Sequence, residues 1–292
     1  MQPKLLKDQP IDEYHDLGDL KTHGADGSVS KTMLSVYADD QRKFKHQFID
    51  GNRREETPSL ALGKAVHTLA LEPQKWKSEY IIVDCDRRTK AGKEEWAEAL
   101  ETGKNIIKSD QMEQIEGMAN ALAANPVALA LLKADGYVEA SILWDDNGLP
   151  LRCRPDFLRN DGLIVDLKTA RNVKPSLFFK DALNFHYDLS VALTMRGYEA
   201  LYGKPADNYV FLCIESTAPY CIECFESMLP MDDTSGMSYL DYGEARLYDL
   251  LDGFRVDWNR FKATGEWPLP PKRIETMNVP AWAMNKMLSD GE

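Results

Sequence analysis

One stretch, residues 154–169, limits the possible folds of this chain more than any other, because it places charge inside an apolar strand pattern. It reads Arg-Pro-Asp-Phe-Leu-Arg-Asn-Asp-Gly-Leu-Ile-Val-Asp-Leu-Lys-Thr. This pattern predicts two short strands joined at residues 160–162, since glycine tolerates the positive φ of a tight turn. Successive side chains of a strand point to opposite faces. Asp166 and Lys168 therefore share one face with Ile164, and the other face is apolar: Leu163, Val165 and Leu167.

A carboxylate and an ammonium group on an apolar strand have two explanations. An exposed edge strand can carry them as a surface ion pair, which is common and weak. The neighbouring residues are instead those of a strand buried on both faces, where charge is costly unless it is paired or bound to a metal. The first strand adds Asp156, directly after Pro155. The hairpin can thus bring together two carboxylates and Lys168, a set suited to binding a divalent metal and positioning a water at a phosphodiester.

Glu139 is a third candidate carboxylate. It lies in a strand predicted at residues 137–144, and a turn at Asn147-Gly148 leads to a partner strand at residues 149–158 that carries Asp156. Glu139 is either an exposed strand residue or a member of the same site. Three carboxylates on three consecutive strands can surround one ion, and we therefore include it.

His67 is a candidate ligand from a helix. The helix begins at Thr57-Pro58, an N-cap followed by proline at the first helical position. Gly63 lies one turn before His67 and Ala70 just after it, so small side chains leave room beside the imidazole. A lone helical histidine is more often a structural residue than a ligand, and the sequence pattern alone favours the structural role.

The remaining patterns predict an α/β fold. Helices are expected near residues 30–48, 57–72, 94–100, 109–122, 126–132, 175–182, 187–202 and 239–264, and two more strands at 209–215 and 220–227. We expect a mixed central sheet built on residues 137–168 and flanked by helices. Residues 1–28 are predicted to form a partly ordered arm, residues 29–285 a single domain, and residues 286–292 a tail.

Composition excludes several classes of protein. The chain is 43% hydrophobic and 28% charged, and no apolar run approaches the length of a membrane span or a signal peptide. Five cysteines, an odd number, argue for reduced thiols in the cytoplasm. The net charge of −12 argues against a protein that coats nucleic acid non-specifically. Basic residues nevertheless cluster, either as solvated faces or as a path for nucleic acid: Arg42, Lys43, Lys45, Arg53 and Arg54; Arg87, Arg88, Lys90 and Lys93; Arg152 and Arg154.

These motifs resemble those of a known family. Pro155-Asp156, nine intervening residues and then Asp166-Leu167-Lys168 resembles the signature of PD-(D/E)xK nucleases. The order of elements over residues 28–285 is similar to that of RecE-type (exonuclease VIII) recombination exonucleases of phages and prophages. Further similar segments are Val29-Ser-Lys-Thr-Met-Leu34, Leu62-Gly-Lys-Ala-Val-His67, Arg88-Thr-Lys-Ala-Gly-Lys93, Glu139-Ala-Ser with Trp144, and Val279-Pro-Ala-Trp282.

The resemblance implies a site and an activity. His67, Asp156 and Asp166 would bind the catalytic metal with Glu139 nearby, and Lys168 would orient or deprotonate the attacking water or stabilise charge on the phosphate. The metal would be Mg²⁺, and Mn²⁺ would substitute for it because a histidine ligand also binds Mn²⁺. Contacts to the DNA backbone would come from Arg88, Lys90, Lys93 and Arg154.

The implied reaction is 5′→3′ exonuclease digestion of linear double-stranded DNA ends, leaving 3′ single-stranded tails for recombination. The implied partners are DNA ends, further copies of the chain in a homo-oligomeric ring, and a single-strand annealing protein. The implied compartment is the cytoplasm of a bacterial host, with a phage or prophage gene. Subunit number, polarity and processivity do not follow from the sequence.

One departure from the family and three alternatives remain. The family places Gln and Tyr in a Gln-x-x-x-Tyr pattern where this chain has the smaller Ser190 and Thr194, so contacts to the DNA end or to the lysine would be weaker or come from elsewhere. The chain could therefore be a catalytically weak or inactive module that binds DNA ends, or an endonuclease on the same fold. The third alternative adds an iron–sulfur cluster to the nuclease, bound by Cys85, Cys213, Cys221 and Cys224.

Overall fold

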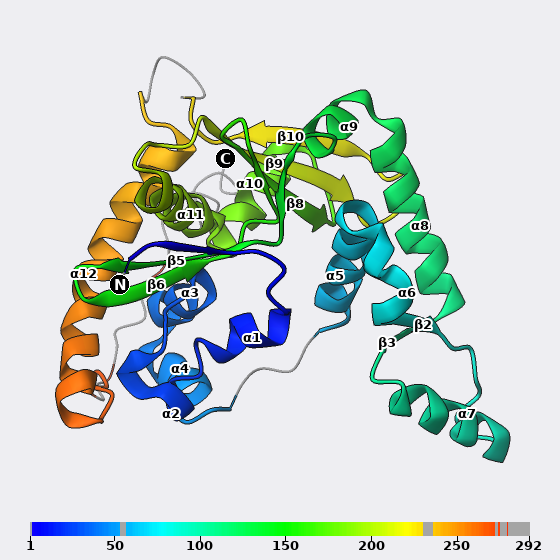
Figure 1. The fold of residues 1–292 in the computed structure, drawn as a ribbon, viewed down its shortest axis with the longest axis horizontal. Coiled ribbons are helices and arrows are strands. Elements are labelled where there is room, and N and C mark those ends of the chain that lie inside the picture. The colour runs from blue at the N-terminus through cyan, green and yellow to red at the C-terminus, as the bar shows by residue number, and fades with distance from the viewer. Residues whose placement is uncertain (1, 53–56, 230–235, 272–273, 275–278, 280–292) are drawn as a thin grey trace, which may run out of the picture.

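The computed structural model describes residues 2–52, 57–229, 236–271, 274 and 279 (Figure 1). Its centre is a five-stranded mixed sheet with the strand order β10-β9-β8-β7-β4. β8 (Leu163–Ala170) and β9 (Asn208–Glu215) run parallel, and every other neighbouring pair in this sheet is antiparallel. The edge strands are β10 (Ile222–Glu226) and β4 (Gly136–Val138), and β7 (Phe157–Arg159) lies between β8 and β4.

Two smaller sheets accompany the central one. β1 (Lys4–Leu6), β5 (Ser141–Asp146) and β6 (Leu149–Cys153) form an antiparallel sheet in the order β1-β5-β6. β2 (Tyr80–Ile82) and β3 (Asn105–Ile107) form a short parallel pair. The prediction of continuous strands at residues 137–144 and 149–158 is therefore wrong. Each is two strands in two different sheets, interrupted at residues 139–140 and at residues 154–156.

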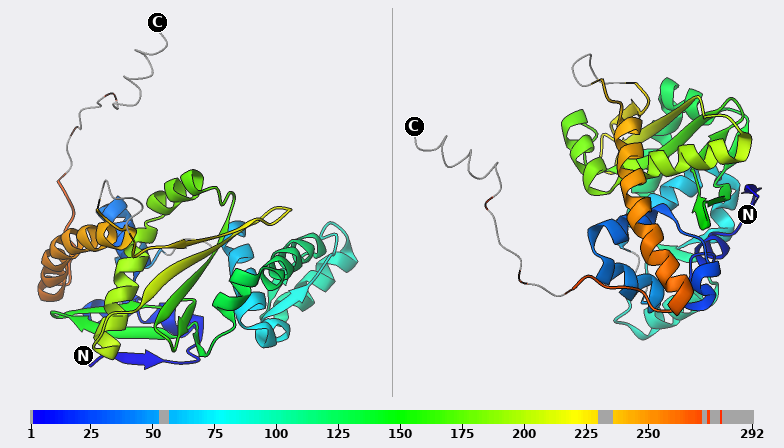
Figure 2. Two further views of the ribbon diagram at one scale, coloured as in Figure 1. Left: turned by 90° about the horizontal axis from the view of Figure 1, so that it is seen from above. Right: turned by 90° about the vertical axis from the view of Figure 1, so that its left-hand side faces the viewer.

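Helices cover both faces of the central sheet, as the α/β prediction required. On one face, α3 (Lys31–Asp39), α10 (Pro175–Asn184), α11 (Tyr187–Tyr202) and α12 (Tyr239–Thr264) share a core with Ile164 of β8. On the other, α5 (Pro58–Leu71), α8 (Ser109–Ala124) and α9 (Pro126–Leu132) share a core with Val165 and Leu167. The predicted alternation of faces along β8 is thus confirmed. Figure 2 shows α12 running along one side of the molecule.

Local capping explains where several helices begin. Thr57 accepts a hydrogen bond from the Leu60 amide and Pro58 is the first residue of α5, as predicted. Ser30 caps α3, also as predicted. The single helix expected near residues 30–48 is broken, however, because Asp40 adopts an extended conformation and its carboxylate caps α4 (Gln41–Phe44) instead. A π-helical turn follows (Lys45–Ile49).

The N-terminal residues do not form the partly ordered arm that the sequence predicted. β1 pairs with β5, and α1 (Ile11–Asp16) and α2 (Leu20–His23) bury Tyr14 and Leu20 against the rest of the protein. The sequence missed this because the segment is polar and its few apolar residues are spread over short elements. The remaining helices are α6 (Trp76–Glu79) and α7 (Lys90–Glu101). The basic pair Arg53-Arg54, residues 280–285 with Trp282, and the tail at 286–292 lie outside the described residues.

Within the described part of the chain, no single helix is both long and apolar enough to cross a bilayer. α8 and α9, which are bent by 91° relative to each other, meet the length and composition criteria only as a pair.

α12 packs closely on α11 through a glycine. A methyl group on Gly243 would lie 2.5 Å from the carbonyl oxygen of Asp188, which belongs to the α11 backbone and cannot easily move. A second glycine of α12, Gly253, has much more room: a methyl group there would lie 3.8 Å from its nearest neighbour, the hydroxyl of Tyr37.

These two glycines predict opposite effects of the same substitution. Gly243→Ala should lower the free energy of unfolding by about 1–3 kcal/mol, because the helices must separate to admit the methyl group. Gly253→Ala should raise it by roughly 0.5–1 kcal/mol, because alanine restricts the unfolded chain and favours the helix. Urea unfolding of both variants checks this. Equal effects of the two substitutions would show that the helices are not in close contact at Gly243.

Candidate active site

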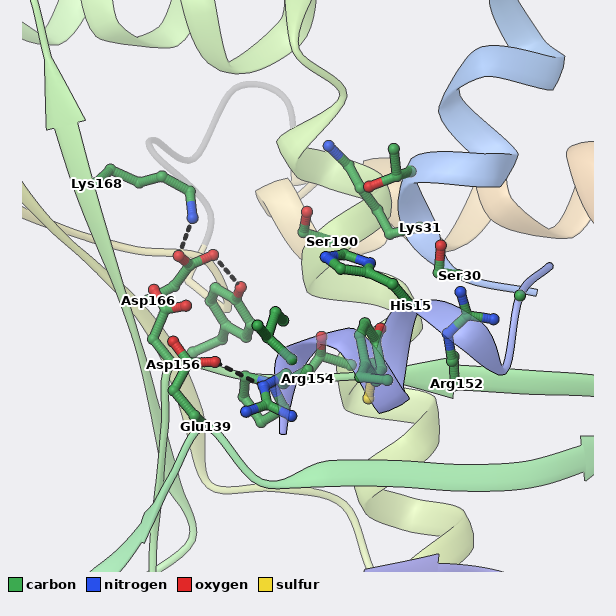
Figure 3. Close-up of a pocket in the computed structure, with 18 of the residues that line it drawn as sticks. His15, Ser30, Lys31, Glu139, Arg152, Arg154, Asp156, Asp166, Lys168 and Ser190 are labelled. Carbon is green, nitrogen blue, oxygen red and sulfur yellow. Dashed lines mark hydrogen bonds and ion pairs between the residues drawn. The ribbon is translucent and has the colours of Figure 1, made fainter. Parts of the chain in front are cut away.

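Most of the predicted site residues line a pocket of about 330 Å³ between the two larger sheets, and His67 lies next to them without lining it (Figure 3). Residues of α1, α3 and α11 form one part of its wall, and residues beside β7 and β8 form the other. Of the sequence-predicted residues, the pocket is lined by Glu139, Arg154, Asp156, Asp166, Lys168, Ser190 and Thr194.

The end of one strand determines how two of the donors are held. Pairing between β7 and β8 stops at Phe157 and Val165, and the residue two positions before Phe157 is Pro155, which has no N–H to donate. Two side chains form the hydrogen bonds to β8 that a longer β7 would otherwise form. The amide of Leu167 donates to Asp156 Oδ2 (2.7 Å), and its carbonyl accepts from His67 Nε2 (2.7 Å). Asp156 and His67 are thus attached to neighbouring atoms of β8.

The hydrogen bond to Leu167 also orients the imidazole of His67. Because Nε2 donates, Nδ1 is the nitrogen that faces the carboxylates, 3.6 Å from Asp156 Oδ1 and 3.9 Å from Glu139 Oε1. One ligand atom from each of these three residues lies within 4.8 Å of the other two. Within the described residues this is the one group of histidine, cysteine or acidic side chains arranged closely enough to hold a metal ion.

Glu139 reaches the site through an unusual backbone conformation. Its φ is +50°, which is unfavourable for a residue with a Cβ atom. The amide of Glu139 donates to the carbonyl of Asp156 (2.9 Å), and Arg154 Nε donates to Glu139 Oε2 (2.8 Å). Arg154 also donates to the carbonyl of Gln9 and to Ser141. Arg154, which was predicted to bind DNA, is part-buried at the pocket, and its guanidinium binds protein acceptors and holds Glu139 in place.

Asp166 lies beside the three-residue group but is not part of it. One of its oxygens accepts from Lys168 Nζ and the other from the hydroxyl of Tyr209. The structure therefore brings together three of the four predicted metal ligands and places Asp166 next to them, engaged with other partners. Sequence analysis missed Tyr209. Its hydroxyl in an otherwise apolar strand was the available signal, since a buried Tyr O–H usually has a partner.

The charges of the site shift one another's pKa values. Burial raises the pKa of Asp156 to about 8. Burial opposes the charge on His67, but Asp156 and Glu139 outweigh it and raise the imidazole's pKa. Burial also opposes the charge on Lys168, and Asp166 outweighs it, so the pKa of that ammonium is raised. The carboxylates of Glu139 and Asp156 and the imidazole of His67, all partly buried, form a donor set that fits Mg²⁺ or Mn²⁺.

The predicted basic loop lies elsewhere. Lys90 and Lys93 belong to α7 and Arg88 precedes it, and none of the three lines the pocket. Figure 1 shows α7 beyond β2 and β3, at the edge of the molecule. Arg88 binds the carboxylate of Asp86, and the side chain of Lys90 is 91% exposed. Two residues beside the pocket that sequence analysis did not propose are Lys31 and Tyr187.

The cysteines do not form a cluster site. All five are described and none is in a disulfide. None belongs to the one group of possible metal ligands in the described residues. Cys213 and Cys224 lie on the paired strands β9 and β10, and burial raises the pKa of both thiols. The alternative of a four-cysteine iron–sulfur cluster therefore has no support in the described residues.

Comparisons with known proteins identify the family and the fold of the chain. The sequence profile of a family described as a PDDEXK-like domain of unknown function (DUF3799) matches residues 28–238. No curated protein sequence matches the chain. A crystal structure of a candidate exonuclease from Eubacterium rectale is similar with a TM-score of 0.59, covering 94% of this chain and 97% of that one at 11% identity. At that identity the likeness concerns the fold. A structure described as SSO0001 covers 75% of this chain and 92% of its own at 13% identity, but its TM-score of 0.26 supports no argument.

Removal of the histidine should separate metal binding from folding. His67→Ala is expected to weaken binding of Mn²⁺ by at least about 10–100-fold, because one of three donors is lost. His46→Ala, which removes an exposed histidine of the π-helical turn, should leave the affinity unchanged. Calorimetric titration with Mn²⁺ measures both. Unchanged affinity in His67→Ala would place the ion somewhere other than this group.

Metal binding should also depend on pH, because protons and the cation compete for the same donors. A carboxyl group must lose its proton to bind the cation, and the pKa of Asp156 is raised to about 8. The apparent affinity for Mn²⁺ should therefore rise at least about tenfold per pH unit below this pKa, because His67, whose pKa is also raised, must lose its proton too. It should level off once both donors have lost their protons. Asp161→Asn, which alters a carboxyl paired with Arg159, should keep the same profile. An affinity that does not change with pH below about 8 would contradict the assignment of Asp156 as a ligand.

Proposed function

Because the chain belongs to the family of PDDEXK-like domains, we propose that it is a metal-dependent nuclease. The observation that carries this proposal is the arrangement of His67, Glu139 and Asp156 around one small volume, directly beside Asp166 and Lys168. A structural ion pair would need none of the first three, and a buried group of acidic side chains is costly unless a cation offsets its charge.

The proposed metal ligands are His67, Glu139 and Asp156, with Asp166 adjacent. PD-(D/E)xK nucleases typically use divalent metal ions. When bound, such an ion polarises the phosphate and lowers the pKa of a bound water. Mg²⁺, with Mn²⁺ as a substitute, suits a site with two carboxylates and one imidazole. The hydrogen bonds from Leu167 and Arg154 keep the donors in place before substrate arrives.

Lys168 has a role as a cation. Its pKa is raised, so the ammonium carries its proton at neutral pH and has no lone pair with which to deprotonate water. It can donate a hydrogen bond to the attacking water and stabilise the negative charge that develops on the phosphate. Two of the three roles considered for it, orientation and charge stabilisation, are therefore supported, and the role of general base is not.

We further propose that the substrate is linear double-stranded DNA and that digestion runs 5′→3′, leaving 3′ tails for recombination. This follows the resemblance of the sequence motifs to RecE-type exonucleases. The fold shared with the Eubacterium rectale protein, itself a candidate exonuclease, supports the exonuclease class alone. A homo-oligomeric ring, a single-strand annealing partner and a bacterial cytoplasmic setting belong to the same proposal.

A second candidate function is binding of DNA ends without efficient cleavage. Ser190 and Thr194 favour it, because they line the pocket with side chains shorter than the Gln and Tyr of the family pattern. The intact group of His67, Glu139, Asp156, Asp166 and Lys168 favours the nuclease, and we give the nuclease precedence for that reason.

The nuclease proposal predicts the result of one assay. In Mg²⁺ the protein should degrade end-labelled linear duplex DNA and leave a covalently closed circle intact. Lys168→Ala should slow degradation by about 10²–10³-fold, the loss typical of one group that stabilises a transition state. As a control, Lys174→Ala removes an exposed lysine directly before α10 and should have no effect. Cutting of the circle would identify an endonuclease. If neither DNA is cut in Mg²⁺ or Mn²⁺, the result would favour the alternative function, binding of DNA ends without cleavage.

A further inference from the structure

Lys31 is a lysine of the pocket that neither the metal group nor the Lys168 pair uses. It is the first residue of α3, directly after the N-cap Ser30. Met33 and Leu34 of the same helix are fully buried in the core, which fixes the direction in which α3 presents Lys31. Figure 3 shows Lys31 and Ser190 on the side of the pocket opposite Asp166 and Lys168.

The other cations of the pocket already have protein partners that occupy them. Lys168 binds the carboxylate of Asp166, and Arg154 binds that of Glu139. Arg152 donates to the carbonyl and hydroxyl of Ser28. Lys31 donates to the carbonyl of Phe185 (2.6 Å), and no carboxylate of the described residues lies within ion-pair distance of it. Its ammonium has three donors, so it can accept an anion as a further partner.

Tyr187 connects this lysine to Lys168. The Nζ of Lys31 lies 5.6 Å from the centroid of the Tyr187 ring, and the Nζ of Lys168 lies 5.2 Å from the same centroid. The two positive charges thus approach one aromatic ring, which attracts both of them modestly. Burial, and then the charge of Lys168, lower the pKa of Lys31 to about 8. Two like charges in a partly buried pocket are costly, and an anion bound to Lys31 would offset that cost.

We propose that Lys31 binds a backbone phosphate of the nucleic-acid substrate on the wall opposite Lys168, with the hydroxyl of Ser190 beside it. This inference rests on the proposed nuclease function and names a substrate-positioning contact within the same pocket. The phosphate held there is a different one from the phosphate at the metal group, because Lys31 lies across the pocket from Asp166. Lys31 contributes no ligand to the metal and touches no proposed metal ligand.

The test compares two neutral substitutions of equal size. Lys31→Met keeps the aliphatic stem and removes the charge, and Lys262→Met does the same to an exposed lysine in the last turn of α12, outside the pocket. Binding to end-labelled linear duplex DNA is measured in Ca²⁺ over a series of salt concentrations, with the DNA checked for integrity. Steady-state degradation is then measured in Mg²⁺, and Mn²⁺ affinity by titration.

For Lys31→Met we expect about a tenfold higher Kd and KM for DNA, which corresponds to one lost charged hydrogen bond. The slope of log Kd against log salt should fall by about 0.9, the value of one phosphate contact on duplex DNA. kcat should stay within about threefold and Mn²⁺ affinity should not change, because Lys31 is not part of the reacting group. Lys31→Arg should restore the salt slope, and Lys262→Met should match the unaltered protein.

Two results would overturn the assignment. An unchanged Kd and salt slope in Lys31→Met would show that no phosphate is bound there. A lower kcat with an unchanged Kd and slope would show that Lys31 only positions Tyr187 and Lys168. The measurement of DNA binding in Ca²⁺ does not depend on turnover. If the unaltered protein binds DNA without cutting it, the nuclease proposal fails while Lys31 is still tested.

Discussion

The candidate site depends on how the backbone of one residue, Leu167, is satisfied. A strand in the middle of a sheet needs a partner for each N–H and C=O group, and an unsatisfied one costs free energy. β7 ends before it can pair with Leu167, so Asp156 accepts from its amide and His67 donates to its carbonyl. These bonds draw α5 to β8 and leave Nδ1 of His67 facing the carboxylates. The interruption that shortens β7 therefore also assembles the ligand group.

The same interruption recurs on the neighbouring strand. β4 and β5 separate at Glu139, whose positive φ is held by a hydrogen bond to the Asp156 carbonyl and by Arg154. The chain thus passes between the two sheets twice, from β4 to β5 and from β6 to β7. The pocket lies where the sheets diverge. Strained backbone of this kind is stable only where its surroundings determine it. Arg154 contributes by linking Glu139 to the carbonyl of Gln9, which explains why the N-terminal segment packs against the site.

Sequence alone predicted the parts of this structure that depend on local patterns. The alternation along β8 identified the faces of Asp166 and Val165, and the cap at Thr57 located the start of α5. The strand breaks at Glu139 and at residues 154–156 were missed, because an apolar run does not record which of two sheets it joins. Tyr209 and Lys31 were missed because their partners lie far away in the sequence. The sequence also does not show that the basic residues around α7 lie away from the pocket, and their contact with DNA stays a prediction.

The central claim is that His67, Glu139 and Asp156 form one metal site beside Asp166 and Lys168. The most direct measurement is anomalous X-ray diffraction near the manganese edge from crystals of the protein equilibrated with Mn²⁺. The account predicts an anomalous peak within bonding distance, about 2.0–2.4 Å, of His67 Nδ1 and of an oxygen of Asp156, with Glu139 also in reach. A peak confined to another part of the protein, or no peak at saturating Mn²⁺, would contradict it.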